Sequence, residues 1–402
     1  MPAASPGGTS VAAYPPKWQA HFHGLPVEPF FQGNRVIIES PDRGNWHVNV
    51  FTSPDFDSHE TVAFFHDGKS RLRAIIAVHS TALGPSCGGT RMYPYADADA
   101  ALTDALRLSR GMSYKSAIAD LPLGGGKAVI IGDPDRDKSD ALFLAFAEAI
   151  NTLGGRYITA MDVGMAPKDM PIIARGTQHI AGYDQPGRPG GNSGPATALG
   201  VFTGLKAAVK HRLGQDTTKG LTVAIQGLGK VGMDLARRLA GEGAKLIVAD
   251  VNTRAVDEAV QSLGATAVRT EEIVSADCDV LSPNALGAVL NDESIPRLKA
   301  RVIAGAANNQ LARNAHGAAL MQRGILYAPD YVINGGGIIC VAGQIFNWND
   351  REIERRVLGI GPTLSAIFAR AHQQGKPTNV VSDEMARERM ARGASPSVRA
   401  AE

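Results

Sequence analysis

A glycine-rich turn followed by a carboxylate is the part of the chain whose residue types point most directly to a ligand. Gly227, Gly229 and Gly232 stand in GLGKVG, after the apolar run 221–225 and at the start of a helical pattern. Glycines there permit a tight turn, close approach of a pyrophosphate and close helix packing, and the helix N-terminus faces the phosphates. The segment predicts a dinucleotide site made of Gly227, Leu228, Gly229, Lys230, Val231 and Gly232.

The acid expected after such a turn is also present. The next apolar run, KLIVAD, ends in Asp250. Its carboxylate should accept hydrogen bonds from the ribose hydroxyls and repel a 2′-phosphate, although Arg254 offers partial compensation. We therefore predict NAD rather than NADP as the cofactor. A structural glycine-rich turn in an unrelated α/β domain is the alternative interpretation.

Lysines in glycine-rich surroundings form a second candidate site, in the first half of the chain. Three segments carry it: LGPSCGGTRM at 83–92, GMSYK ending in Lys115, and LGGGK ending in Lys127. Glycine lets a ligand approach the backbone, and lysine supplies positive charge. A P-loop is excluded because it needs Gly where Leu121 stands and Ser or Thr where Ala128 stands. A surface lysine remains the alternative for Lys115.

Strand-like and helical runs alternate along the chain, which predicts an α/β fold. An apolar strand pattern at 73–80 precedes a helical pattern at 97–110, and similar pairs follow. The Gly- and Pro-rich loop at 183–195 is typical of a crossing between domains. Beyond it, repeated strand and helix units predict a doubly wound sheet.

We therefore expect two domains with a cleft between them and less ordered ends. The predicted parts are a disordered N-terminus at 1–30, an α/β substrate domain at 31–189, a Rossmann cofactor domain at 190–345, helices at 346–392 that pack back on the first domain, and a flexible tail at 393–402.

Composition favours a protein that acts on small molecules in a reducing compartment. The 402 residues include 41 Lys and Arg against 39 Asp and Glu, which excludes the concentrated basic field that nucleic acids or anionic membranes require. The three cysteines lack disulfide or metal-ligand spacing, so we predict no metal site. Since no leader-like or bilayer-spanning apolar stretch occurs, we expect a cytoplasmic protein.

Eight motifs occur in order between about residues 60 and 390: LGPSCGGTRM, RGMSYKSA, LPLGGGKAVIIGDP, YITAMDVG, GPATALGV, AIQGLGKVG, AGAANNQLA and YAPDYVINGGGI. In this set the chain resembles the leucine/phenylalanine/valine dehydrogenase branch of the glutamate dehydrogenase superfamily. The resemblance implies a homo-oligomeric enzyme that transfers a hydride from an amino acid's α-carbon to nicotinamide. Water then attacks the imine, and ammonia leaves.

The resemblance also assigns roles to the charged residues. Lys115 would bind the substrate carboxylate. Lys127 would activate water, which requires a lowered pKa. Asp162, in YITAMDVG, would exchange protons with the substrate amine. An aspartate that caps a helix or stabilises a turn is the alternative for Asp162.

Further contacts are implied for uncharged residues. Gly88, Gly89 and Met112 would contact the substrate, and Thr197 would line the nicotinamide pocket. Asn309 would donate hydrogen bonds near both cofactor and substrate, with Asn308 as the alternative.

Four positions are implied as walls of the side-chain pocket: Cys87, Ala160, Ile338 and Val341. None is Lys or Arg, so a glutamate substrate would leave a desolvated charge. The bulk of Ile338 favours a substrate with an aliphatic rather than an aromatic side chain. The small Cys87 has the opposite effect, because it leaves more volume in the pocket. The balance favours leucine, valine or isoleucine.

Two residues depart from the resemblance, since Met161 and Met165 stand where relatives carry Glu and Thr. The loss of these polar groups would change the pKa of Asp162 or the shape of the substrate pocket. We predict NAD-dependent, reversible oxidative deamination of an apolar L-amino acid to the 2-oxo acid and ammonium. The alternatives are an aromatic amino-acid dehydrogenase, an enzyme that couples an imine to another nucleophile, and a non-catalytic NAD-binding sensor.

Overall fold

The computed structural model describes residues 50–184 and 192–393, and these belong to one compact unit, Asn49–Glu402. The predictions for residues 1–30 and for the tail beyond Gly393 lie outside the described residues. Within the two described ranges, no helix combines the length and the apolar character that crossing a bilayer requires.

The first sheet contains five strands in the order β1-β2-β4-β3-β5. Their bounds are β1 Thr61–Asp67, β2 Leu72–Ser80, β3 Ser86–Tyr93, β4 Gly124–Ile131 and β5 Tyr157–Met161. Strand β2 runs antiparallel to both β1 and β4, whereas β3 runs parallel to both β4 and β5. The C-terminal ends of β3 and β5 therefore lie at the same edge of the sheet.

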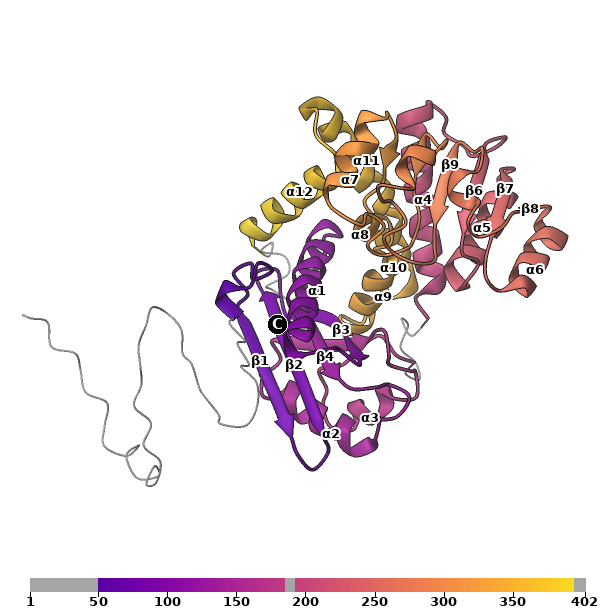
Figure 1. Ribbon diagram of the computed structural model, residues 1–402. Helices are drawn as coiled ribbons and strands as arrows, with labels where there is room; N and C mark the ends of the chain where they lie inside the picture. The colour runs from indigo at the N-terminus through magenta and orange to yellow at the C-terminus, as the bar shows by residue number, and fades with distance from the viewer. Residues whose placement is uncertain (1–49, 185–191, 394–402) are drawn as a thin grey trace, which may run out of the picture. The chain divides into compact units, whose positions relative to one another are not determined.

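Apolar residues alternate along β2 and β4 and are buried on both faces of this sheet. Ile75, Ala77 and Val129 pack against α1 (Ala98–Ile118) on one face. Their neighbours in the sequence pack against α2 (Asp140–Asn151) and α3 (Met170–Ala174) on the other. Helix α1 lies beside the sheet in Figure 1, with α2 and α3 near its lower end. Because side chains alternate along a strand, Lys127 lies on the same face as Val129, the face that α1 covers.

Helix α1 begins at a side-chain cap and carries one of the predicted lysines. The Asp97 carboxylate accepts a hydrogen bond from the Ala100 backbone amide at 2.7 Å. Such a cap stabilises a helix start by about 1 kcal/mol. The helix then extends for 21 residues across the sheet and places Lys115 in its last turn.

The second sheet contains six parallel strands in the order β11-β10-β9-β6-β7-β8. Their bounds are β6 Thr222–Gln226, β7 Lys245–Ala249, β8 Thr266–Ala267, β9 Val280–Pro283, β10 Val302–Ile303 and β11 Leu326–Tyr327. Strand order reverses between β6 and β9, and ligands bind in doubly wound sheets at the carboxyl ends of the strands at such a point. The predicted α/β fold with a doubly wound sheet is confirmed.

The first four helices of this half are α4 (Gly194–Leu213), α5 (Lys230–Gly241), α6 (Thr253–Leu263) and α7 (Ala315–Gln322). Five more follow in the chain: α8 (Asp330–Ile333), α9 (Gly336–Ile345), α10 (Asp350–Leu358), α11 (Ile360–Gln374) and α12 (Thr378–Arg392). Helices α10 and α11 contact α4, whereas α12 contacts α1. The chain beyond residue 346 thus contacts elements of both predicted domains, and the predicted boundaries stay predictions.

Candidate active site

A partly buried ion pair joins two of the residues predicted to be catalytic. Lys127 lies on β4 and is 5% exposed, and its ammonium Nζ donates to the Asp162 carboxylate Oδ2. Asp162 directly follows the last residue of β5. Sheet order brings them together, because β4 and β5 are the two neighbours of β3.

The ion pair is part of a larger charge network that the sequence did not reveal. Arg91 on β3 contacts the Asp162 carboxylate through Nε at 3.2 Å, and its NH1 contacts the Asp104 carboxylate at 2.9 Å. The Tyr95 hydroxyl donates to the same Asp104 oxygen at 2.5 Å. Arg91 belongs to the motif LGPSCGGTRM, but no spacing relates it to an aspartate on a helix.

Burial and pairing oppose each other in setting the pKa values of the catalytic pair. Burial lowers the pKa of Lys127, an effect that the Asp162 charge opposes and the Arg91 charge reinforces. Burial alone would raise the pKa of Asp162, but the charges of Lys127 and Arg91 outweigh it and lower that pKa. The site therefore holds a carboxylate beside an ammonium group that loses its proton more easily than a lysine in water.

Close backbone packing around Asp162 requires glycine on β3. A Cβ added to Gly89 would lie 2.8 Å from the Asp162 Cβ. A Cβ added to Gly88 would lie 1.7 Å from the Gly126 carbonyl oxygen and 3.4 Å from the Met112 Cγ. The structure therefore explains both glycines by packing and places Met112 beside them. Their predicted contact with the substrate stays a prediction.

Lys115 projects from α1 within electrostatic reach of the catalytic pair. Burial lowers the pKa of Lys115 to about 8, with Asp330 and Asp162 opposing the shift and Lys127 adding to it. Asp330, at the start of α8, accepts hydrogen bonds from the backbone amides of Gln310 (2.8 Å) and Tyr331 (2.6 Å). Asp330 stands in the motif YAPDYVINGGGI, but nothing in that motif indicates that it approaches Lys115.

The structure brings two of the four predicted pocket walls, Ala160 and Val341, close together. A Cβ added to Gly182 would lie 3.3 Å from the Ala160 Cβ and 3.2 Å from Val341 Cγ2, so these two side chains flank Gly182. Cys87 and Ile338 are both buried in one apolar cluster, and Val341 packs against it. Burial raises the pKa of the Cys87 thiol to about 12, so this side chain is a small neutral group.

Gln344 ties the segment after β5 to α9. Its side-chain oxygen accepts from the Gly182 amide at 2.5 Å, and its side-chain nitrogen donates to the Tyr183 carbonyl at 2.8 Å. Gln344 is buried, so these two bonds also satisfy its polar atoms. They hold Val341, on the same helix, beside Ala160.

The glycine turn has the geometry of a phosphate-binding loop. Gly227 has a φ of +95°, and a Cβ added to Gly232 would lie 2.0 Å from the Gly227 carbonyl oxygen. A Cβ added to Gly229 would meet no described atom within 4 Å, so the space beside it is open. Helix α5 begins at the next residue, Lys230, which is exposed. An open approach to a helix N-terminus fits a pyrophosphate.

Asp250 stabilises this turn directly. One carboxylate oxygen accepts from the Leu228 amide at 2.5 Å and the other accepts from the Asn252 amide at 2.7 Å. A carboxylate can accept about four hydrogen bonds. Two acceptor positions therefore remain for ribose hydroxyls.

The chain is similar to known amino-acid dehydrogenases. Residues 59–179 match the model of the Glu/Leu/Phe/Val dehydrogenase dimerisation domain, and residues 248–391 match that of glutamate/leucine/phenylalanine/valine dehydrogenase. Leucine dehydrogenase from Geobacillus stearothermophilus is 49% identical over 343 residues, which cover 85% of this chain and 94% of that protein. Valine dehydrogenase from Streptomyces albus is 46% identical over 340 residues, 84% of this chain and 93% of that protein.

The chain belongs to the Glu/Leu/Phe/Val dehydrogenase family. It is an amino-acid dehydrogenase that uses a pyridine nucleotide. The solved structure of L-tryptophan dehydrogenase from Nostoc punctiforme is similar to this one, with a TM-score of 0.75 and 43% identity over 83% of this chain and 96% of that one. The predicted family is confirmed.

Two further regions contain residues predicted to contact the ligands. Thr197 lies in the first turn of α4, and Asn308 and Asn309 follow β10. The Thr197 hydroxyl donates to the Ser193 carbonyl at 2.8 Å. A Cβ added to Gly337 would lie 3.5 Å from the oxygen of the same Thr197 hydroxyl. The Asn308 side-chain oxygen accepts from Asn334 at 2.7 Å. Asn308 and Asn309 are both exposed, and Asn309 has a φ of +51°, so the predicted ligand contact of Asn309, with Asn308 as the alternative, stays a prediction.

The two methionines that depart from the family pattern occupy different environments. Met161, beside Asp162, is 41% exposed. Met165 packs against the apolar cluster between the first sheet and α2. Met165 therefore contributes to the core.

The Arg91 network predicts the pH dependence of this dehydrogenase. Arg91→Gln removes a positive charge that lowers the pKa of both Lys127 and Asp162, so both pKa values should rise. A neutral Lys127 and an ionised Asp162 would then each require a higher pH. We expect the acid limb of the pH profile of kcat/KM to move up by on the order of one unit.

Arg73→Gln, at an exposed position on β2, is the control and should leave the limb in place. An unchanged acid limb in Arg91→Gln would show that Arg91 does not set these pKa values.

Proposed function

We propose that this dehydrogenase catalyses the reversible, NAD-dependent oxidative deamination of an aliphatic L-amino acid of leucine size. The observation that carries the proposal is the partly buried Lys127–Asp162 ion pair with Lys115 nearby. Two cations and one carboxylate suit a substrate that presents a carboxylate and an amine. The leucine dehydrogenases, 46 to 49% identical to this chain, support the substrate class.

In this mechanism Lys115 binds the substrate carboxylate and thereby orients the amino group toward Asp162. Asp162 takes one proton from the substrate ammonium, which frees the nitrogen lone pair to form the C=N bond. The nicotinamide, when bound, accepts the hydride that leaves the α-carbon. Asp162 is suited to this step because its lowered pKa keeps it ionised at neutral pH.

Hydrolysis of the resulting iminium uses both members of the pair. Lys127, in its neutral form, takes a proton from the water whose oxygen bonds to the α-carbon. Asp162 returns its proton to the nitrogen and then takes the hydroxyl proton as the C–N bond breaks. The products are the 2-oxo acid and ammonia, with one proton left on each of Lys127 and Asp162. Burial, which lowers the pKa of Lys127, favours its part in this step.

The cofactor residues support NAD in particular. Gly227, Gly229 and Gly232 shape the open turn, and Asp250 keeps acceptor capacity for a ribose. A 2′-phosphate would meet the Asp250 carboxylate and be repelled. Thr197 and Asn309 would complete the nicotinamide end of the site. The match of residues 59–179 to a dimerisation domain supports a homo-oligomer. We also propose that the enzyme acts in the cytoplasm.

A second candidate substrate is an aromatic amino acid. The similarity to L-tryptophan dehydrogenase and the small side chains of Cys87 and Ala160 favour it. Ile338 opposes it, because a β-branched residue at a pocket wall narrows the space for a ring. Coupling of the imine to another nucleophile, or NAD binding without catalysis, draws no support from the paired Lys127 and Asp162.

The function is tested with purified enzyme, NADH, ammonium and a panel of 2-oxo acids. We expect NADH to be oxidised fastest with 4-methyl-2-oxopentanoate, and only when ammonium is present. Oxidation that starts with another amine but not with ammonium would indicate imine coupling. The absence of any turnover, with NADH binding retained, would indicate a sensor.

Replacing the catalytic lysine should remove turnover without removing cofactor binding. We expect Lys127→Ala to lose at least about two orders of magnitude in kcat, because water then lacks its base, while NADH fluorescence titration stays normal. The control is Lys168→Ala, at an exposed position on the loop before α3. Near-normal turnover of Lys127→Ala would contradict the assignment.

Cofactor preference should depend on the acid after β7. We expect kcat/KM to be higher with NAD than with NADP, and Asp250→Ser to narrow the difference because it relieves charge repulsion. Since Asp250 also binds the Leu228 amide, thermal unfolding should be measured in parallel. Equal use of both cofactors by the unmodified enzyme would refute the NAD assignment.

Side-chain preference should respond to the wall at Ile338. We expect Ile338→Ala to raise activity on phenylalanine relative to leucine, because the opened volume admits a ring and loosens contact with a branched chain. Ile339→Ala, at the next position of α9, is a matched control that removes the same side chain. An unchanged ratio in Ile338→Ala would show that this wall does not set specificity.

A further inference from the structure

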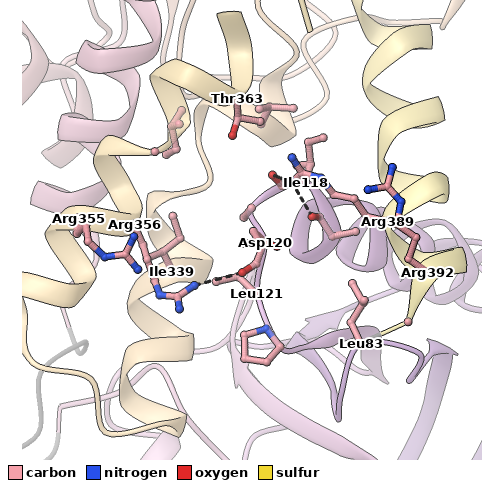
Figure 2. Close-up of a pocket in the computed structure, with 17 residues that line it drawn as sticks. Leu83, Ile118, Asp120, Leu121, Ile339, Arg355, Arg356, Thr363, Arg389 and Arg392 are labelled. Carbon is pink, nitrogen blue, oxygen red and sulfur yellow. Dashed lines mark hydrogen bonds between the residues drawn. The ribbon is translucent and has the colours of Figure 1, made fainter. Parts of the chain in front are cut away.

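A cavity of about 550 Å³ lies at the C-terminal end of α1, and its lining contains neither Lys127 nor Asp162 (Figure 2). This volume is typical of small-molecule sites. Four arginines contribute to the lining, Arg355 and Arg356 from α10 and Arg389 and Arg392 from α12. Figure 2 shows the two pairs on either side of the turn at Asp120 and Leu121 that follows α1.

Two of these arginines have contacts that explain them structurally. Arg389 NH1 donates to the carbonyls of Ala117 (3.0 Å) and Ile118 (2.6 Å), in the last turn of α1. Arg356 NH1 donates to the Asp120 carbonyl at 3.2 Å, and its guanidinium stacks on Trp348 at 3.9 Å. Cations are favourable at a helix C-terminus, so these contacts stabilise the end of α1.

The other two arginines add charge that such contacts do not require. Arg355 is 67% exposed and shares the Glu352 carboxylate with Arg356. Arg392 is 75% exposed and lies 3.9 Å from Glu388, a carboxylate that also binds Arg370 at 2.5 Å. Among the described residues that line the cavity, the only carboxylate is Asp120. The lining therefore carries more positive than negative charge, and Glu352, outside the lining, balances part of it by binding Arg355 (2.7 and 2.8 Å) and Arg356 (2.7 Å).

Charge is distributed unevenly within the cavity. The arginines lie at its two sides, and Asp120 and Leu121 lie between them (Figure 2). Further apolar side chains line the cavity: Leu83, Val332, Ile339 and Ile360. A ligand with negative groups at both ends would contact both arginine pairs. An uncharged middle would pack on the apolar residues and avoid repulsion by Asp120.

We propose that this cavity binds a small, elongated dianion with a phosphate or carboxylate group at each end and an uncharged body. Each arginine pair binds one end, since guanidinium groups form bidentate, charge-assisted hydrogen bonds with these anions. The site is separate from the catalytic residues and does not depend on the proposed function.

The proposal is tested by calorimetric titration of the enzyme saturated with whichever pyridine nucleotide it binds, NAD or NADP, so that the cofactor site is occupied. The probes are hexane-1,6-diyl bisphosphate, hexyl phosphate and inorganic phosphate. We expect saturable binding of the bisphosphate at one site per chain, at least about tenfold tighter than hexyl phosphate and weaker at high salt. Inorganic phosphate should bind more weakly than either.

Variants locate the binding. Arg355→Gln with Arg392→Gln should weaken bisphosphate binding at least about tenfold, because each end loses one guanidinium. Arg351→Gln removes an exposed arginine from the same helix α10 but outside the cavity, and should change nothing. Thr363→Trp, on α11, fills the cavity without changing its charge. This variant should abolish bisphosphate binding.

Three outcomes would overturn the proposal: no saturable binding of the bisphosphate, equal affinity for hexyl phosphate, or equal losses in Arg351→Gln and the double variant. Catalytic activity is measured separately in each protein. A failure of the proposed function would leave the binding result intact, and the reverse also holds.

Discussion

The ion pair between Lys127 and Asp162 is the interaction on which the rest of the candidate active site depends. Removing Asp162 would leave the buried Lys127 ammonium without its nearest opposite charge, which is costly in a site that water reaches poorly. Here Arg91 and Asp104 extend the pair into a four-membered network that alternates in sign. Alternation lets each buried charge keep an opposite neighbour, so the site can hold a carboxylate and an easily deprotonated lysine together.

Helix α1 connects this network to the other functions of the chain. Its body supplies Asp104 to the network, and its last turn supplies Lys115. Its C-terminal carbonyls bind Arg389 from α12, at the edge of the arginine-lined cavity. One helix therefore contacts the catalytic charges, the proposed substrate carboxylate and the proposed dianion site. A ligand in the cavity would touch the same helix that carries Lys115.

The cofactor half rests on a different constraint, which is backbone conformation rather than charge. Gly232 is needed because a side chain there would collide with the Gly227 carbonyl, and Gly227 because its φ of +95° lies in the left-handed region, while Gly229 leaves space open. Asp250 then binds the turn through the Leu228 amide. The acid expected to select the cofactor thus also helps to shape the loop that receives it.

The sequence by itself determined the α/β alternation, the glycine turn with Asp250 and the family, because these follow from local spacing and from motifs read in order. Only the tertiary structure placed Arg91 on Asp104, Asp330 near Lys115 and Met165 in the core. Each of these contacts joins side chains from different elements. They depend on sheet order, strand register and helix packing, which no local pattern of residues specifies.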